Sequence, residues 1–337
     1  MGYYDGGDLN YYYSMATNFA TSDRWFSPVM SRTPPNREFL IAATSNGYVN
    51  QRGKNPPFDS ALIPAKTIFE ALQAAGITWK IYVPNAGTRC ASDTSPSCLI
   101  KLSYVKDFTF GQTIVNQYPQ NLVPISQFIT DAQNGTLPQV AQIEPASGAG
   151  LDEHPSDNDP PAGGQPCCST QKGAQFVSTL INAVMCAPNS NPCTPDKSWK
   201  DSAFILTFDE FGGFYDHVAP VPTVSPDGIP PVDLYPNDVC LSTPGPTCDF
   251  TYTGYRVPMI LVSPFAKKNF VSHSTTDYTA ILKLIEKRFG LGALTNRDAA
   301  QIDMAQEFFD FTNQPWMTPP NPQKQDTSKA CYLDHLP

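Results

Sequence analysis

Short apolar runs alternate along the chain with longer stretches in which apolar residues recur every three or four positions. Runs of about four to eight apolar residues are typical of buried strands, and the longer repeat is typical of helices. The short runs predict strands at residues 77–83, 139–144, 203–208 and 258–262. The longer repeat predicts helices at residues 9–20, 63–75, 125–134, 173–185 and 277–289. Residues 38–43 form a further apolar stretch that is either helical or extended.

The alternation of strands with helices favours a largely parallel sheet with helices on both faces. We therefore expect an α/β fold with a mostly parallel central sheet. A length of 337 residues can hold one large domain or two smaller ones, and we expect one domain over residues 1–314. A Pro-rich C-terminal tail follows at residues 315–337. The 34 prolines and 21 glycines indicate that the domain contains long, ordered loops.

Two neighbouring acids follow the predicted strand at residues 203–208. Asp209 and Glu210 stand where the strand stops, and a glycine pair comes after them. Ligands of open α/β sheets bind beyond the carboxyl ends of the strands, and carboxylate oxygens suit a cation. Asp216 and His217 lie within reach of the same turn. The position favours a cation site or a reacting group, and a solvated acidic loop is the alternative interpretation.

Two further polar groups lie in predicted loops. Thr33 precedes two prolines and then Asn36 and Arg37, so a hydroxyl on a stiff turn stands beside a guanidinium. Such a hydroxyl is a candidate nucleophile for an anionic substrate, although the same residues also suit an ordinary helix-entry turn. His154 lies in the long loop at 145–171, among acids and glycines. A histidine in a loop is either a surface residue or a group that exchanges protons in a site.

The charge of the chain limits its partners. The formal net charge is -9 and the pI is about 4.9, and no cluster of Lys and Arg offsets the acids. Nucleic acid is therefore not an expected partner, because binding it needs a basic face that displaces counterions. No apolar stretch approaches the roughly 18 residues that a transmembrane helix requires.

The nine cysteines favour disulfides. Three pairs bracket short loops and suit local disulfides in an oxidising compartment: Cys90/Cys98, Cys186/Cys193 and Cys240/Cys248. Zinc binding is the alternative, but no Cys-x-x-Cys spacing occurs and the chain has only four histidines. Cys167, Cys168 and Cys331 have no assigned partner. We expect a secreted or periplasmic protein, and since residues 1–5 do not resemble a secretion signal, an upstream segment is expected.

Seven segments, taken in order, resemble the phosphoesterase family of microbial phospholipases C and acid phosphatases. They are residues 1–9, 22–27, 33–37, 134–140, 152–155, 208–218 and 257–266. The resemblance implies an alkaline-phosphatase-like α/β/α sandwich. It also implies hydrolysis of phosphate esters, with phospholipid headgroups among the substrates, by a hydroxyl nucleophile that a metal ion assists.

Each implied role falls on a residue of this sequence. Thr33 matches the nucleophile, and Asp209 and Glu210 match a pair of metal ligands. His154 matches a histidine that contacts the phosphoryl group or the leaving oxygen, and His273 matches another recurrent histidine. We expect the substrate to contact Asn36, Arg37 and His217.

The chemistry of phosphate esters agrees with this assignment. A cation held by carboxylates lowers the pKa of a hydroxyl and offsets charge on the phosphoryl oxygens, while an imidazole can protonate the departing alcohol. The implied course passes through a phosphothreonine at Thr33, which water then hydrolyses. The divalent ion is calcium, magnesium, manganese or zinc. Whether the substrate is a diester or a monoester, and the oligomeric state, stay open.

One departure from the family affects the expected activity. Family members carry a Glu-Asn pair near the N-terminus that supplies further metal ligands, and this sequence has no Glu-Asn dipeptide. We therefore expect the 337-residue chain to be poorly active by itself. A catalytically silent binding protein of the same fold is the alternative. A sulfatase is less favoured, because its nucleophile would be Cys or Ser where this chain has Thr33.

Overall fold

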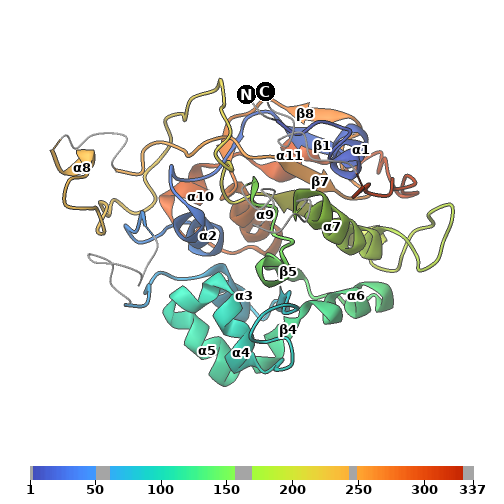
Figure 1. Ribbon diagram of the computed structural model, residues 1–337, viewed down its shortest axis with the longest axis horizontal. Helices are drawn as coiled ribbons and strands as arrows, with labels where there is room; N and C mark the ends of the chain where they lie inside the picture. The colour runs from blue at the N-terminus through green and yellow to red at the C-terminus, as the bar shows by residue number, and fades with distance from the viewer. Residues whose placement is uncertain (1–2, 51–60, 156–168, 243–248, 329–337) are drawn as a thin grey trace.

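The computed structural model describes residues 3–50, 61–155, 169–242 and 249–328 (Figure 1). Its strands form one sheet in the order β6-β7-β1-β8, a second in the order β4-β3-β5, and the pair β2-β9. The strands are β1 (Ala20–Ser22), β2 (Trp25–Phe26), β3 (Trp79–Val83), β4 (Leu122–Pro124), β5 (Val140–Ile143), β6 (Phe204–Thr207), β7 (Met259–Val262), β8 (Phe270–Ser272) and β9 (Thr276–Asp277).

Most neighbouring strands are parallel, which confirms the expected α/β class. The pairs β1-β8, β2-β9, β3-β4 and β3-β5 are parallel, whereas β7 runs antiparallel to both β1 and β6. Because Thr207 of β6 pairs with Met259 of β7, the chain leaving β6 runs beside the chain entering β7. This antiparallel pair places the segment after β6, which carries the predicted acids, next to residues 255–258.

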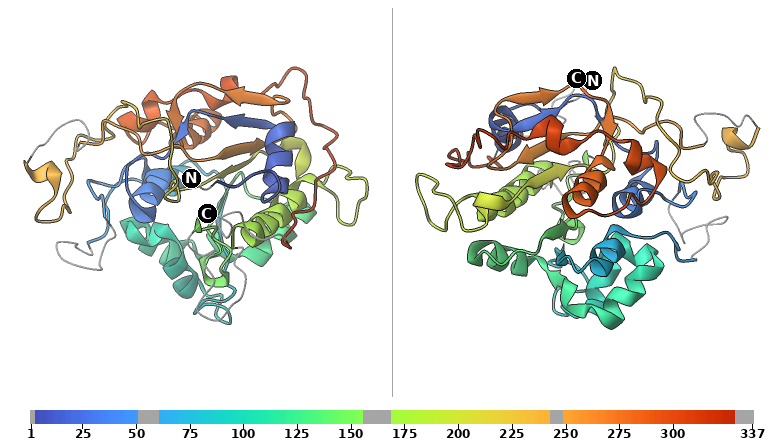
Figure 2. Two further views of the ribbon diagram at one scale, coloured as in Figure 1. Left: turned by 45° about the horizontal axis from the view of Figure 1, so that its top comes forward. Right: turned by 180° about the vertical axis from the view of Figure 1, so that it is seen from behind.

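Helices separate and cover the sheets. They are α1 (Asn10–Asn18), α2 (Thr33–Ala42), α3 (Ile68–Ala74), α4 (Pro96–Leu99), α5 (Thr109–Gln117), α6 (Ile125–Asn134), α7 (Ser169–Met185), α8 (Val239–Ser242), α9 (Ala280–Phe289), α10 (Asn296–Ala300) and α11 (Met304–Phe308). Figures 1 and 2 show the four-stranded sheet with α1 and α11 at one end of the molecule, and the three-stranded sheet with α3 to α6 at the other.

The long helix α7 joins these two halves. Its Ile181 and Met185 pack into the apolar core around the four-stranded sheet, while Leu180 and Val184 pack with Phe128 of α6 on the side of the three-stranded sheet. A helix that buries apolar residues on two sides fixes the distance between the layers on either side of it. The two sheets are thereby held as parts of one packed structure.

The ends of helices and strands predicted from the sequence pattern differ from the observed ends where a local contact holds the chain in another conformation. The predicted helix at 63–75 begins only at Ile68, because Ile63 pairs with Phe108 as an isolated bridge and Thr67 caps the helix by accepting from the Glu70 N–H. The helix at 125–134 has the predicted bounds. The strands β1, β2, β4, β8 and β9 were not predicted, because two or three residues carry no detectable period.

The described part of the C-terminal tail packs against the body. Gln325 is buried, its side-chain carbonyl accepts from the Tyr11 N–H at 3.2 Å, and its amide donates to the Asp8 carbonyl at 2.8 Å. Both bonds hold the start of α1. Residues 315–328 are therefore part of the framework around α1.

Two of the predicted disulfides are present. Cys90–Cys98 and Cys186–Cys193 have S–S distances of 2.00 Å and 2.02 Å. The predicted partner of Cys240, together with Cys167, Cys168 and Cys331, lies outside the described residues. Among the helices of the described segments, none has the length and apolar character needed to cross a bilayer.

A buried pair of acids should make stability depend on pH. Burial, a hydrogen bond to Asp298 and the charge of Asp298 raise the pKa of Glu286 from 4.5 to about 8. The folded state therefore holds a proton that the unfolded chain releases, so stability present at low pH is lost as the pH rises through about 8. We expect the melting temperature to fall between about pH 5 and pH 8 and to level off above that, by roughly 2–4 °C for each kcal/mol lost.

The variant Glu286→Gln stays neutral and should show a shallower fall. The slope should not vanish, because Glu153 is also buried with its pKa raised to about 8. Thermal unfolding followed by circular dichroism measures both proteins, with the exposed Asp201→Asn as the matched control. Equal slopes for Glu286→Gln and the control would contradict the assignment.

Candidate active site

A hydroxyl near the start of the chain meets an acid far along it. The Thr33 Oγ1 atom donates to Glu210 Oε1 at 3.1 Å, across 177 positions of sequence. Thr33 is the first residue of α2, and Glu210 follows β6 in the segment that leaves the sheet. The structure thus brings together the predicted nucleophile and one of the two predicted metal ligands.

The turn that presents Thr33 is held by Asn36. The buried Asn36 side chain accepts from the Val29 N–H at 3.2 Å and donates to the carbonyls of Ser31 and Arg32 at 3.1 Å and 3.3 Å. Proline in the first turn of α2 costs no hydrogen bond, because backbone N–H groups there have no helical partner. In this geometry Asn36 positions the loop before Thr33, and its predicted contact with substrate stays a prediction.

Arg37 is paired inside the molecule. Its Nη2 atom donates to Glu144 Oε2 at 2.7 Å, and its guanidinium lies 5.5 Å from the ring centroid of Tyr104. Although burial alone would lower the pKa of Arg37, the charges of Glu144 and Asp209 raise it. The guanidinium therefore stays charged and contributes positive potential beside Asp209.

Sequence reasoning missed Glu144. It follows β5, is buried, and also accepts from Ser103 Oγ at 2.7 Å and Gln142 Nε2 at 2.8 Å. An acid at the end of a predicted strand was the signal that singled out Asp209, and the same signal applies to Glu144. Its three donors indicate that it anchors Arg37.

Asp209 and Glu210 form a half-buried pair of acids. Burial and the charge of Asp209 raise the pKa of Glu210, while the hydrogen bond from Thr33 and the charges of His154 and Arg32 oppose that rise. Two adjacent carboxylates repel each other unless a cation lies between them. The residues fit a divalent cation as oxygen ligands, with the Thr33 hydroxyl as a neighbouring oxygen.

These oxygens account for only part of a coordination sphere. In the segments that the structure describes, no group of three or more His, Cys, Asp and Glu side chains is arranged to hold a metal ion. A divalent cation usually takes about six oxygen ligands. The remaining ligands would come from substrate, water or residues beyond these two acids.

The segment after β6 is clamped to the segment before β7. Continuing the β6-β7 register places Phe211 opposite Tyr255, and their ring centroids lie 4.3 Å apart. The Arg256 guanidinium then donates to both oxygens of Asp216, at 2.7 Å and 2.5 Å. A bidentate guanidinium-carboxylate pair fixes direction as well as distance. Both contacts restrict the loop that begins with Asp209.

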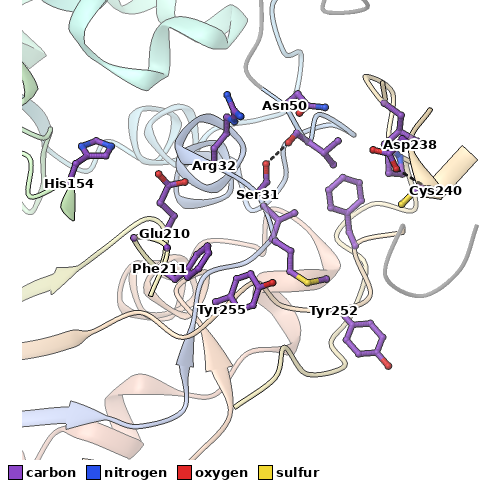
Figure 3. A pocket seen from close by; sticks show the side chains of 18 of the residues that line it. Ser31, Arg32, Asn50, His154, Glu210, Phe211, Asp238, Cys240, Tyr252 and Tyr255 are labelled. Carbon is purple, nitrogen blue, oxygen red and sulfur yellow. Dashed lines mark hydrogen bonds between the residues drawn. The ribbon is translucent and has the colours of Figure 1, made fainter. Parts of the chain in front are cut away.

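A pocket of about 590 Å³ opens beside this loop. Figure 3 shows Glu210, His154 and Arg32 on one side of it and Asp238 and Cys240 on the opposite side. The wall between them is largely apolar and aromatic, with contributions from Val29, Met30, Val49, Phe211, Phe250, Tyr252 and Tyr255. The volume lies in the range of pockets that hold small organic ligands.

His154 lines the polar end of the pocket. Its Nδ1 atom lies 2.8 Å from Asp152 Oδ2, and about half of its side chain is exposed. The neighbouring Glu153 is buried against α1, where Tyr12 Oη donates to it at 2.6 Å. Gly212 allows the close approach of Pro155, since a Cβ there would lie 2.8 Å from the proline ring. These contacts bring the histidine beside the Glu210 loop.

His217 and His273 do not line this pocket. Their side chains are 78% and 76% exposed, and their Nδ1 atoms lie 3.8 Å from Asp216 and 2.8 Å from Asp23. Arg256 links the two acids, because it binds Asp216 and donates to the Asp23 carbonyl at 2.9 Å. Both histidines thus belong to one surface network around Arg256, and their predicted roles stay predictions.

Known proteins match this chain over most of its length. It is similar to non-specific phospholipase C5 of Arabidopsis thaliana, with 32% identity over 86% of the chain and 49% of that protein. It is similar to phospholipase C B of Mycobacterium tuberculosis, with 28% identity over 99% of the chain and 59% of that protein. The chain therefore spans about half to three fifths of the length of these relatives.

Among solved structures, murine ectonucleotide pyrophosphatase/phosphodiesterase 5 aligns with a TM-score of 0.45 and 14% identity, over 85% of the chain and 91% of that structure. The sequence model described as the Phosphoesterase family matches residues 1–292. That match covers the segments that carry Thr33, His154, Asp209 and Glu210. The chain belongs to the phosphoesterase family.

Proposed function

We propose that this protein hydrolyses phosphate esters with Thr33 as the nucleophile. The 3.1 Å hydrogen bond between Thr33 Oγ1 and Glu210 Oε1 carries the proposal, since it joins the two residue types that the chemistry requires. Membership of the phosphoesterase family and the phospholipase C relatives support a phosphate-ester substrate, and phospholipids among such substrates.

The reaction proceeds in two steps. The Thr33 hydroxyl proton passes toward Glu210, to which it is already donated, while Oγ1 forms a bond to phosphorus. The bond from phosphorus to the alcohol oxygen breaks, and protonated His154 gives that oxygen a proton. In the second step the neutral His154 takes a proton from water, and the water oxygen bonds to phosphorus. The bond from phosphorus to Thr33 Oγ1 breaks, and Glu210 returns its proton to Oγ1. The 2.8 Å contact with His154 lowers the pKa of Asp152, so the Asp152 carboxylate stays charged and orients the imidazole.

Asp209 and Glu210 are the residues that would hold a divalent cation. When bound, that cation offsets charge on the phosphoryl oxygens and makes the neighbouring hydroxyl more acidic. Arg37 adds a fixed positive charge near Asp209, held in place by Glu144. The two disulfides support a secreted or periplasmic location, where such bonds persist.

Removing the Thr33 hydroxyl should abolish turnover. Thr33→Val keeps the shape of the side chain but leaves no atom to bond with phosphorus, so kcat/KM should fall at least about 10³-fold. Thr33→Ser retains a hydroxyl and should retain a measurable rate and a phosphoenzyme detectable by mass spectrometry. Hydrolysis of p-nitrophenyl phosphate and p-nitrophenylphosphocholine measures both. A Thr33→Val protein as active as wild type, or a wild-type protein without turnover, would overturn the proposal.

Cation binding should depend on the two acids. We expect titration calorimetry with manganese to show affinity at least about tenfold weaker in Asp209→Asn and in Glu210→Gln, since each removes one charged oxygen ligand. Asp201→Asn, on the surface before β6, is the control and should bind as wild type. If neither substitution changes affinity, the cation lies elsewhere, and if wild type binds none, the catalytically silent alternative gains support.

The Arg256 clamp should support the same loop from outside the pocket. Arg256→Gln removes both bonds to Asp216 and should lower kcat/KM by about 10- to 100-fold, because the acids lose their fixed position. Arg256→Lys cannot form the fork and should recover only part of the loss. Asp216→Asn should weaken the same contact, so the loss of kcat/KM in the double variant Arg256→Gln/Asp216→Asn should be smaller than the sum of the two single losses in free energy. Additive losses, or an equal loss in Arg288→Gln on α9, would contradict the clamp.

A further inference from the structure

A projecting segment at the rim of the pocket carries exposed apolar side chains. We call residues 229–242 the arm; it ends in α8, which Figure 1 shows reaching away from the body of the molecule. Four large apolar residues of the arm are exposed: Val232 at 52%, Tyr235 at 45%, Val239 at 67% and Leu241 at 57%. Exposed apolar groups gathered on one segment mark an interaction surface.

The base of the arm is firmly anchored. The buried Asp233 carboxylate accepts from the N–H groups of Val49 and Asn50 at 2.8 Å and 2.9 Å, and Asn50 Nδ2 donates to the Asp233 carbonyl at 2.9 Å. Gly47 lets the arm come close, because a Cβ at that position would lie 2.6 Å from the Pro230 carbonyl. The apolar side chains are therefore held outward on a fixed base.

The arm and the proposed catalytic groups share one pocket. Asp238 and Cys240 of the arm line the side opposite Glu210 and His154 (Figure 3), and Leu234 of the arm also lines the pocket. Val232, Tyr235, Val239 and Leu241 do not line it. Whatever covers these four side chains must therefore lie beside the arm residues that line the pocket.

The charge of this region selects among possible partners. Residues 219–255 contain no Lys or Arg, while Asp233 and Asp238 lie within the arm. An anionic surface needs basic side chains for attraction, so neither an anionic membrane nor a nucleic acid suits it. Four apolar side chains are also few against the roughly 800 Å² that each partner buries in a stable protein interface. Acyl chains, in contrast, accept separate apolar side chains without a matching shape, and tyrosine suits the boundary of a bilayer.

We propose that the arm docks on the surface of a zwitterionic phospholipid bilayer by inserting its exposed apolar side chains. This docking holds the mouth of the pocket at the depth of the lipid phosphates. The reason for docking there rests on the proposed function, whereas the binding itself does not. Binding should follow the apolar side chains and should not need anionic lipid.

Vesicle sedimentation tests the proposal with the full chain. The variant Val239→Ser/Leu241→Ser should bind phosphatidylcholine vesicles at least about tenfold more weakly than wild type, because two inserted side chains lose their burial. The matched control Val271→Ser/Phe311→Ser removes two exposed apolar side chains outside the arm and should bind as wild type. Adding phosphatidylserine to the vesicles should not strengthen binding by wild type.

Soluble and vesicular substrates separate this proposal from the proposed function. The arm variant should hydrolyse p-nitrophenylphosphocholine as wild type does and should lose activity only on vesicles. Absence of turnover on the soluble substrate defeats the proposed function, yet arm-dependent vesicle binding would still support docking. The docking proposal is overturned by equal binding of the arm variant and wild type, by no binding of wild type, by a preference for anionic vesicles, or by a dimer in solution that the arm variant disrupts.

Discussion

The antiparallel pairing of β6 with β7 is the constraint on which the site depends. It brings the chain that leaves one strand beside the chain that enters the other, and the Phe211–Tyr255 rings and the Asp216–Arg256 pair continue that pairing beyond the sheet. Without these contacts, a loop that contains two adjacent glycines in the left-handed region would have many conformations. The position of Glu210 against Thr33 is therefore set by strand register first and by side chains second.

The charges around Asp209 and Glu210 are the second feature that shapes the candidate site. Arg37 lies near Asp209 but is bound to Glu144, which is in turn fixed by Ser103 and Gln142. The arginine thus supplies potential without moving into the space between the acids. This arrangement leaves Asp209 and Glu210 with an excess of negative charge, which is the electrostatic condition that a divalent cation relieves.

The sequence pattern predicted the features that depend on local order. The α/β class, most of the long helices and two disulfides could be read from periodicity and spacing, because each is decided within about twenty residues. The short strands β1, β8 and β9 could not, because they exist only through pairing with distant segments.

The same division applies to the site. Thr33, Asp209, Glu210 and His154 could be named as candidates from the sequence. Other features depend on tertiary contacts, which the spacing of residues along the sequence does not reveal. They are the exposure of His217 and His273, the hydrogen bonds by which Asn36 holds the loop before Thr33, and the ion pair of Glu144 with Arg37.

The attachment of Gln325 to α1 links the far end of the described chain to the candidate active site. Gln325 secures the first turn of α1, Tyr12 on that helix bonds to Glu153, and Glu153 adjoins His154. A protease cut or a fused tag that pulls this segment away would loosen the helix, and the disturbance would pass through Tyr12 and Glu153 to the backbone that carries His154. Preparations trimmed at the C-terminal side would then differ in the position of His154 even though every pocket residue is intact.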